Sequence, residues 1–138
     1  MIIIRNFHPR HRIPVKLEEI KSLIKSVFKT EKRNIEAAYL NFVTNSQILA
    51  INKKYLKHNY YTDIITFDYS FPGDRKIDGE MIISLDRIRV NAGIYKTNFK
   101  NETKRVIIHG CLHLAGYNDR TKAEKELIRF KENSYLRN

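Results

Sequence analysis

Apolar residues recur along the chain with two spacings, one typical of helices and one typical of strands. Between Leu17 and Lys29 they return every three to four positions, which predicts an amphipathic helix. The same spacing predicts helices over 46–57, 86–95 and 101–115, and along the segment that follows Thr121. Runs of β-branched and aromatic residues predict strands over 1–7, 35–44, 62–69 and 80–85. The last two strands are expected to form a hairpin.

These elements predict one α+β domain over residues 1–138, with a mixed sheet of about four strands packed against about five helices. The helix over 101–115 is apolar on several sides, so we expect it to lie centrally. Two other helices carry start signals. Thr44 is followed three residues later by Gln47, and Thr121 by Glu124, which is the spacing of a capping box.

The central helix also carries the candidate chemistry of the chain. His109 and His113 are four residues apart, so they lie about 40° apart on one helix face and can share a metal ion. Gly116 is a natural helix stop, because glycine tolerates the left-handed conformation. The reversing chain could return Asp119 as a third ligand. This arrangement would leave one zinc coordination position open for water and predicts a hydrolytic metal centre.

The spacing resembles the H-E-x-x-H-x-x-G-x-x-H motif of zinc hydrolases, with Asp119 in the place of the last histidine. Gly110 stands where those peptidases have their glutamate, so their general base is missing. We therefore expect a metal hydrolase that is not a protease. Glycine within a helix costs about 0.8–1 kcal/mol relative to alanine. Gly110 is expected either to leave space beside the metal or to allow close packing against the 62–69 strand.

The charge of the chain indicates the kind of partner. The net charge is +11, which implies an anionic partner, and nucleic acid fits best. A solvated basic surface is the alternative explanation. Cys111 is the only cysteine, which excludes an internal disulfide and fits a reducing compartment; we expect it to be buried on the far side of the histidine helix. The sequence shows neither a signal peptide nor a membrane span, so we expect a cytoplasmic protein.

Three stretches resemble the YbeY family of bacterial endoribonucleases, and the resemblance covers most of the chain. The stretches are Ile51–Tyr55 with Tyr61–Phe67, Asp78–Ser84 and, above all, His109–Tyr117. The resemblance implies a single-strand-specific endoribonuclease with one Zn²⁺ ion. It also implies a partnership with rRNA and the ribosome, in 16S rRNA 3′-end maturation and ribosome quality control. His109 and His113 would be zinc ligands.

Two positions depart from the family pattern. The family usually ends its motif with Asp-His, where this chain has Asn118 and Asp119, so Asp119 is either the third ligand or a turn residue. The family commonly has an arginine where this chain has Leu56. The basic end of the 46–57 helix could take over its RNA contacts. The candidate RNA-binding residues are Lys53, Lys57, His58 and Tyr61, with Tyr60 as a further stacking candidate.

Glu80 and Asp63 are the candidates for a general base, and Glu80 is the one we include with the catalytic histidines. Two other functions stay open. The histidine spacing would also suit a zinc metallopeptidase-like hydrolase. A non-catalytic protein that binds RNA or the ribosome through its basic surface, with a structural zinc, is the second alternative.

Overall fold

The computed structural model describes residues 1–58 and 62–137. In these residues the elements, in chain order, are β1 (Ile2–Asn6), α1 (Leu17–Thr30), β2 (Asn34–Val43), α2 (Asn45–Leu56), β3 (Ile64–Asp68), β4 (Lys76–Ser84), α3 (Leu85–Ile94), α4 (Phe99–Leu114) and α5 (Lys122–Leu136). The predicted α+β class is therefore confirmed. No helix in this described part is both long and apolar enough to cross a membrane.

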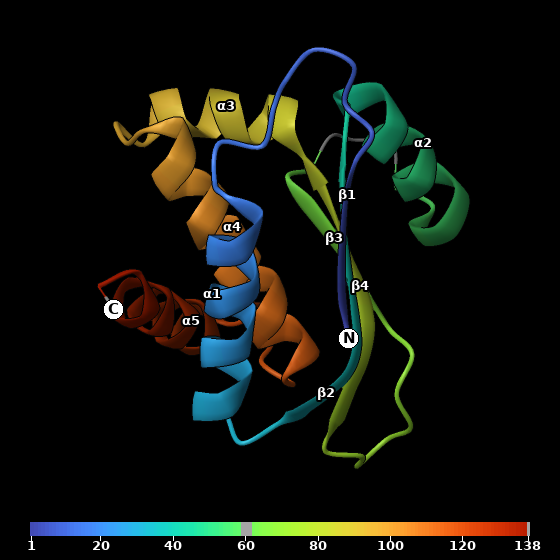
Figure 1. The fold of residues 1–138 in the computed structure, drawn as a ribbon, viewed down its shortest axis with the longest axis vertical. Helices are drawn as coiled ribbons and strands as arrows, with labels where there is room; N and C mark the ends of the chain where they lie inside the picture. The colour runs from blue at the N-terminus through green and yellow to red at the C-terminus, as the bar shows by residue number, and fades with distance from the viewer. Residues whose placement is uncertain (59–61, 138) are drawn as a thin grey trace.

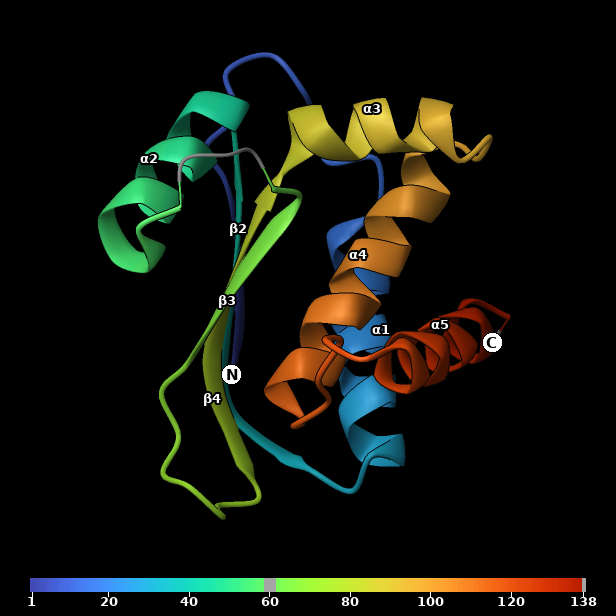
Figure 2. The same cartoon turned by 180° about the vertical axis from the view of Figure 1, so that it is seen from behind.

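The four strands form one mixed sheet in the order β1-β2-β4-β3. β1 pairs in parallel with β2, and β2 in parallel with β4. β3 pairs antiparallel with β4, which confirms the predicted hairpin. Helices α1, α4 and α5 lie on one side of the sheet and α2 on the other, while α3 crosses one end (Figure 1). The view from behind shows the same two sides (Figure 2).

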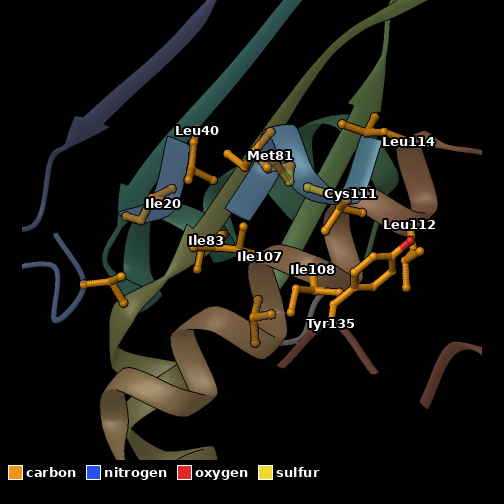
Figure 3. Packing of buried hydrophobic residues seen from close by; sticks show 14 of the residues in the cluster. Ile20, Leu40, Met81, Ile83, Ile107, Ile108, Cys111, Leu112, Leu114 and Tyr135 are labelled. Carbon is orange, nitrogen blue, oxygen red and sulfur yellow. The ribbon is translucent and has the colours of Figure 1, made fainter. Parts of the chain in front are cut away.

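Helix α4 is central, as predicted, because it packs against α1, α3 and α5 and against strands β3 and β4. Its apolar side chains meet the inner face of the sheet in the main core (Figure 3). Ile107 and Cys111 from α4 are fully buried there, together with Met81 from β4. The expected burial of Cys111 is confirmed, and burial raises the pKa of its thiol far above the ordinary value.

A second, smaller apolar cluster lies between α2 and the outer face of the sheet, built from Val43, Ile48, Ile65 and Ile82. Strands β2 and β4 therefore bury residues on both faces, which explains why their sequences alternate only loosely.

The apolar spacing that predicts α2 and α5 includes Tyr55 and Leu56 on α2 and Leu127 and Phe130 on α5. In the structure these four side chains are exposed. The predictions for the helix starts were better, since Thr44 and Thr121 both form complete capping boxes. Hydrogen bonds at a helix start depend on neighbouring residues alone, whereas burial depends on what packs against the helix.

Candidate metal centre

Helix α4 and the segment after it bring three donor atoms together. His109 and His113 lie on the same face of α4, and their Nε2 atoms are 3.0 Å apart. Oδ2 of Asp119 lies 3.4 Å from Nε2 of His109 and 3.3 Å from Nε2 of His113. These are the three residues predicted from the motif, and as a group they can hold a metal ion.

The end of α4 explains why Asp119 returns to the histidines. Gly116 has a φ of +108°, in the left-handed region that glycine tolerates. Its N–H donates to the carbonyl of His113 (3.0 Å), and the N–H of Tyr117 donates to the carbonyl of Leu112 (3.0 Å). These two bonds form a Schellman motif, which ends the helix and reverses the chain. The Tyr117 hydroxyl then donates to Glu31 of the 31–33 turn (2.6 Å), which anchors the segment before Asp119.

The spacing of the three donor atoms fits a tetrahedral ion. With ligand distances of about 2.0–2.1 Å, two ligands of a tetrahedral zinc ion lie about 3.3 Å apart. The three observed separations, 3.0, 3.3 and 3.4 Å, are close to that value. The side chains of His109, His113 and Asp119 remain 22%, 24% and 42% exposed, so the group faces an opening. Imidazole and carboxylate donors suit zinc and other divalent transition metals.

A fourth residue, Glu132 of α5, contacts His109 on the side opposite the other two donors. Its Oε2 lies 2.6 Å from Nδ1 of His109, on the ring side away from the other donor atoms. Glu132 is not among the site residues predicted from the sequence. Its spacing in the sequence was the available signal. Glu132 lies four residues after Ile128 and three before Tyr135, on the apolar stripe of α5, where a charged residue is unusual.

The pKa values reflect this contact. Burial lowers the pKa of His109, but the hydrogen bond to Glu132 and the charges of Glu132 and Asp119 outweigh burial, so the pKa is raised. Burial raises the pKa of Glu132, but the hydrogen bond and charge of His109 and the charge of Arg105 lower it below the ordinary range. Both shifts favour an ionised Glu132 beside a proton-bearing His109.

The centre opens into a small cavity of about 210 Å³, lined by Asp63, His109, His113 and Asp119 and by Thr62, Ile64 and Thr66. Asp63 therefore lies beside the three donors. Its Oδ2 also accepts from the amide of Asn91 at 3.4 Å.

Glu80, the catalytic carboxylate named from the sequence, lies elsewhere. Its neighbour Gly79 faces α4, because a Cβ there would lie 2.8 Å from Leu114. Successive strand residues point to opposite faces, so Glu80 points away from α4. On that outer face it accepts hydrogen bonds from Asn41 (2.7 Å) and Tyr69 (2.8 Å). The structure thus contradicts a direct role for Glu80 beside the histidines.

Gly110 faces the sheet and not the cavity. A Cβ at this position would lie 2.6 Å from Cδ1 of Ile64 and 2.6 Å from Sδ of Met81. Of the two explanations offered for this glycine, close packing against the strands is therefore the one that the geometry favours. The residue after the first histidine contributes no side chain to the centre.

The RNA-binding candidates are not gathered at the cavity. Lys53 is exposed on α2, Lys57 is the left-handed residue that ends α2, and the His58 N–H donates to the carbonyl of Asn52 (3.1 Å). None of the described residues that line the cavity comes from α2. Tyr60 and Tyr61 lie outside the described residues. The contacts proposed for all five stay predictions.

A second group of possible ligands, His8, His11 and Asp86, also lies close together. Its hydrogen bonds oppose metal binding. Nδ1 of His8 accepts from the backbone N–H groups of Arg10 (3.1 Å) and His11 (3.0 Å), so it carries no proton. The proton of the neutral ring is then on Nε2, which donates to Asp86 (2.8 Å). This group therefore ties the 7–16 segment to α3.

A comparison with known protein families agrees with the motif at the centre. The family described as Endoribonuclease YbeY matches residues 6–138. The chain belongs to the YbeY family. It is 46% identical over 123 residues to an Endoribonuclease YbeY of Bacteroides thetaiotaomicron, which covers 88% of both chains. It is 42% identical over 123 residues to an Endoribonuclease YbeY of Parabacteroides distasonis, which covers 88% of this chain and 84% of that one.

A solution structure from Thermotoga maritima has the same fold. Its TM-score is 0.69 at 24% sequence identity, and the match covers 99% of this chain and 87% of that chain.

The two positions at which the sequence departs from the YbeY pattern, Asp119 and Leu56, can now be placed in the structure. Asp119, which stands at the sequence position of the motif's last histidine, has its carboxylate within reach of both other donors. Leu56, in the place of the usual arginine, is exposed at the end of α2.

Proposed function

We propose that this protein is a zinc-dependent endoribonuclease that cleaves single-stranded RNA, with a role in 16S rRNA 3′-end maturation and ribosome quality control. The observation that carries the proposal is the trio His109, His113 and Asp119, whose donor atoms are spaced like the ligands of one tetrahedral ion. Membership of the YbeY family supports RNA as the substrate. The net charge of +11 also favours a polyanion.

His109, His113 and Asp119 would hold the ion. When bound, zinc supplies Lewis-acid stabilisation of charge on a phosphate oxygen and lowers the pKa of water toward about 7. Asp63 is the described carboxylate that lines the cavity without belonging to the trio. We assign it the role of proton acceptor, the alternative to Glu80 that the sequence offered. Thr62 and Thr66 line the same cavity. The Thr62 hydroxyl donates to the carbonyl of Ile64 (3.4 Å), and Thr66 is the threonine that we assign as a donor to a phosphate oxygen.

A second, larger depression is our candidate for binding the flanking RNA strand. Ile64 and Thr66 line the metal cavity, whereas Asp68 and Ser70, farther along the chain, line this depression of about 750 Å³. Arg75 and Tyr117 also line this depression, and Phe71, 81% exposed, stands at its edge. Exposed aromatic rings of this kind can stack on unpaired bases.

The two alternatives fit the geometry less well. A peptidase of the related motif needs a glutamate after the first histidine, and here that position is Gly110, packed against Ile64 and Met81. A structural zinc site normally has four protein ligands and is closed. The trio supplies three ligands and opens into a cavity, which is the arrangement of a catalytic site.

The proposal is tested by incubating the purified protein with unstructured RNA, with the same RNA in a duplex and with casein. We expect zinc-restored cleavage of the unstructured RNA alone, and its loss after chelation. Asp63→Asn should lower the cleavage rate by about 10²–10⁴-fold while zinc content stays constant. Casein hydrolysis would instead support the peptidase alternative. RNA binding without cleavage in the zinc-loaded protein would support the non-catalytic one.

A further inference from the structure

A charged residue in the protein interior requires partners, and Glu132 has two close ones, His109 and Arg105, with the more exposed Arg129 at 3.8 Å as a third. The residue is only 1% exposed. Its Oε2 faces Nδ1 of His109 at 2.6 Å, and its Oε1 accepts from Nη1 of Arg105 at 3.1 Å. Burying an unpaired carboxylate is costly, and these contacts with a histidine and an arginine favour the ionised form of Glu132.

Arg105 is itself held in place. Its Nε donates to Oε1 of Glu102 (2.9 Å), and Glu102 is also only 1% exposed. The Tyr95 ring lies over the guanidinium, 6.0 Å from its carbon. The planar guanidinium therefore joins two buried carboxylates and fixes the orientation of Glu132. A continuous row runs from Glu102 through Arg105 and Glu132 to His109.

This row determines where His109 carries its proton. An ionised carboxylate can only accept a hydrogen bond, so Nδ1 of His109 must be the donor. In the neutral ring Nε2 then has a free lone pair. That lone pair faces Nε2 of His113 and Oδ2 of Asp119, where a metal ion would bind.

We propose that Glu132 is a positioning residue that fixes His109 in the tautomer able to bind a metal through Nε2, and that Arg105 and Glu102 hold Glu132 for this purpose. The inference rests on the proposed zinc function. Carboxylates that orient a ligand histidine typically change metal affinity by about 10–100-fold. Glu132, 23 residues along the chain from His109, thereby makes helix α5 part of the metal centre.

The test compares Glu132→Gln with Glu126→Gln, a control at an exposed carboxylate on the same helix. The amide introduced by Glu132→Gln cannot accept from both His109 and Arg105 without turning its own donor toward one of them. We expect the zinc dissociation constant of Glu132→Gln, measured by competition with a chelating dye, to rise about 10–100-fold. The control should stay within about twofold of wild type. An unchanged affinity in a folded Glu132→Gln protein would overturn the inference.

A second measurement uses the wild-type protein alone and does not depend on a variant that folds. The nitrogen chemical shifts of His109 in the metal-free protein, at a pH where the ring is neutral, report which nitrogen is protonated. We expect the proton on Nδ1, and a proton on Nε2 would overturn the inference. If the wild-type protein binds no zinc, the proposed function fails, and the shifts still decide the tautomer separately.

Discussion

Gly110 illustrates how closely α4 packs on the sheet beside the metal centre. In Gly110→Ala the new Cβ would collide with Ile64 and Met81, both at 2.6 Å. Overpacking of this kind costs about 1–3 kcal/mol, and the better helix propensity of alanine returns about 1 kcal/mol. We therefore expect a protein up to about 2 kcal/mol less stable to urea, with normal RNA cleavage per folded molecule.

Gly93 provides the matched control. It lies in helix α3, and a Cβ there would meet nothing within 4 Å. Gly93→Ala should therefore stabilise the protein by about 0.5–1 kcal/mol. If Gly110→Ala stayed folded and kept its zinc but lost cleavage, the glycine would serve the substrate and not the packing.

Asp119 is the residue at which the centre departs from its family. Asp119→His introduces the usual third ligand at a position whose present carboxylate is 3.3–3.4 Å from both other donors. We expect this variant to bind one zinc ion per chain, as measured by metal analysis after dialysis. Asp119→Ala should bind zinc much more weakly, because it removes a ligand. If Asp119→Ala bound zinc like the wild type, Asp119 would be a turn residue only.

Asp86, in the first turn of α3, connects this helix with the N-terminal segment and with α2. Its Oδ1 accepts from His8 (2.8 Å) and its Oδ2 accepts from the N–H of Asn45 (2.8 Å), at the start of α2. Burial raises the pKa of Asp86, but the hydrogen bonds from Asn45 and His8 outweigh it, so the pKa is lowered. Losing such bonds to a charged group costs about 1.5–3 kcal/mol each.

Asp86→Ala should therefore lower the free energy of unfolding at neutral pH by a few kcal/mol. A carboxyl with a lowered pKa in the folded state stabilises the protein above its ordinary value of 3.8 and loses that effect as pH falls through the folded-state value. The difference from wild type in urea unfolding should thus shrink below about pH 4. Glu36→Gln, at an exposed carboxylate of β2, is the control. An equal difference at low pH would contradict an ionised Asp86.

The helices and strands were largely predictable from the sequence because their signals are local. The capping boxes at Thr44 and Thr121 and the stop at Gly116 involve residues a few positions apart. The face of Glu80 was not predictable, because β4 is buried on both sides and its alternation is obscured. Glu132 was missed for a different reason. Its contact with His109 exists only after α5 has packed on α4.

The candidate metal centre likewise contains residues that the sequence predicts and residues that only tertiary packing brings in. His109, His113 and Asp119 share one helix and its reversal, so their spacing in the sequence already specified their meeting. Asp63 reaches the cavity from the start of β3, and only the packing of α4 on that strand brings it there. Motifs within one element thus identify the ligands, while the groups around them depend on tertiary packing.

At the scale of the whole molecule, the net charge of +11 predicts that RNA affinity depends on salt. Each phosphate contact with a single strand contributes about −0.7 to the slope of log K against log salt. Three contacts would give a slope of about −2. We expect the affinity for unstructured RNA, measured with the metal-free protein so that the RNA stays intact, to fall at least this steeply. A salt-independent affinity would contradict a role for the basic surface in RNA binding.

The central claim is that His109, His113 and Asp119 hold a zinc ion, and zinc content tests it most directly. Wild type and His113→Ala are purified in parallel, supplied with zinc, dialysed and analysed for metal, with circular dichroism to verify the fold. We predict one zinc ion per wild-type chain and strong loss in His113→Ala, because two remaining ligands bind zinc weakly. Equal zinc content in the two folded proteins would contradict the account.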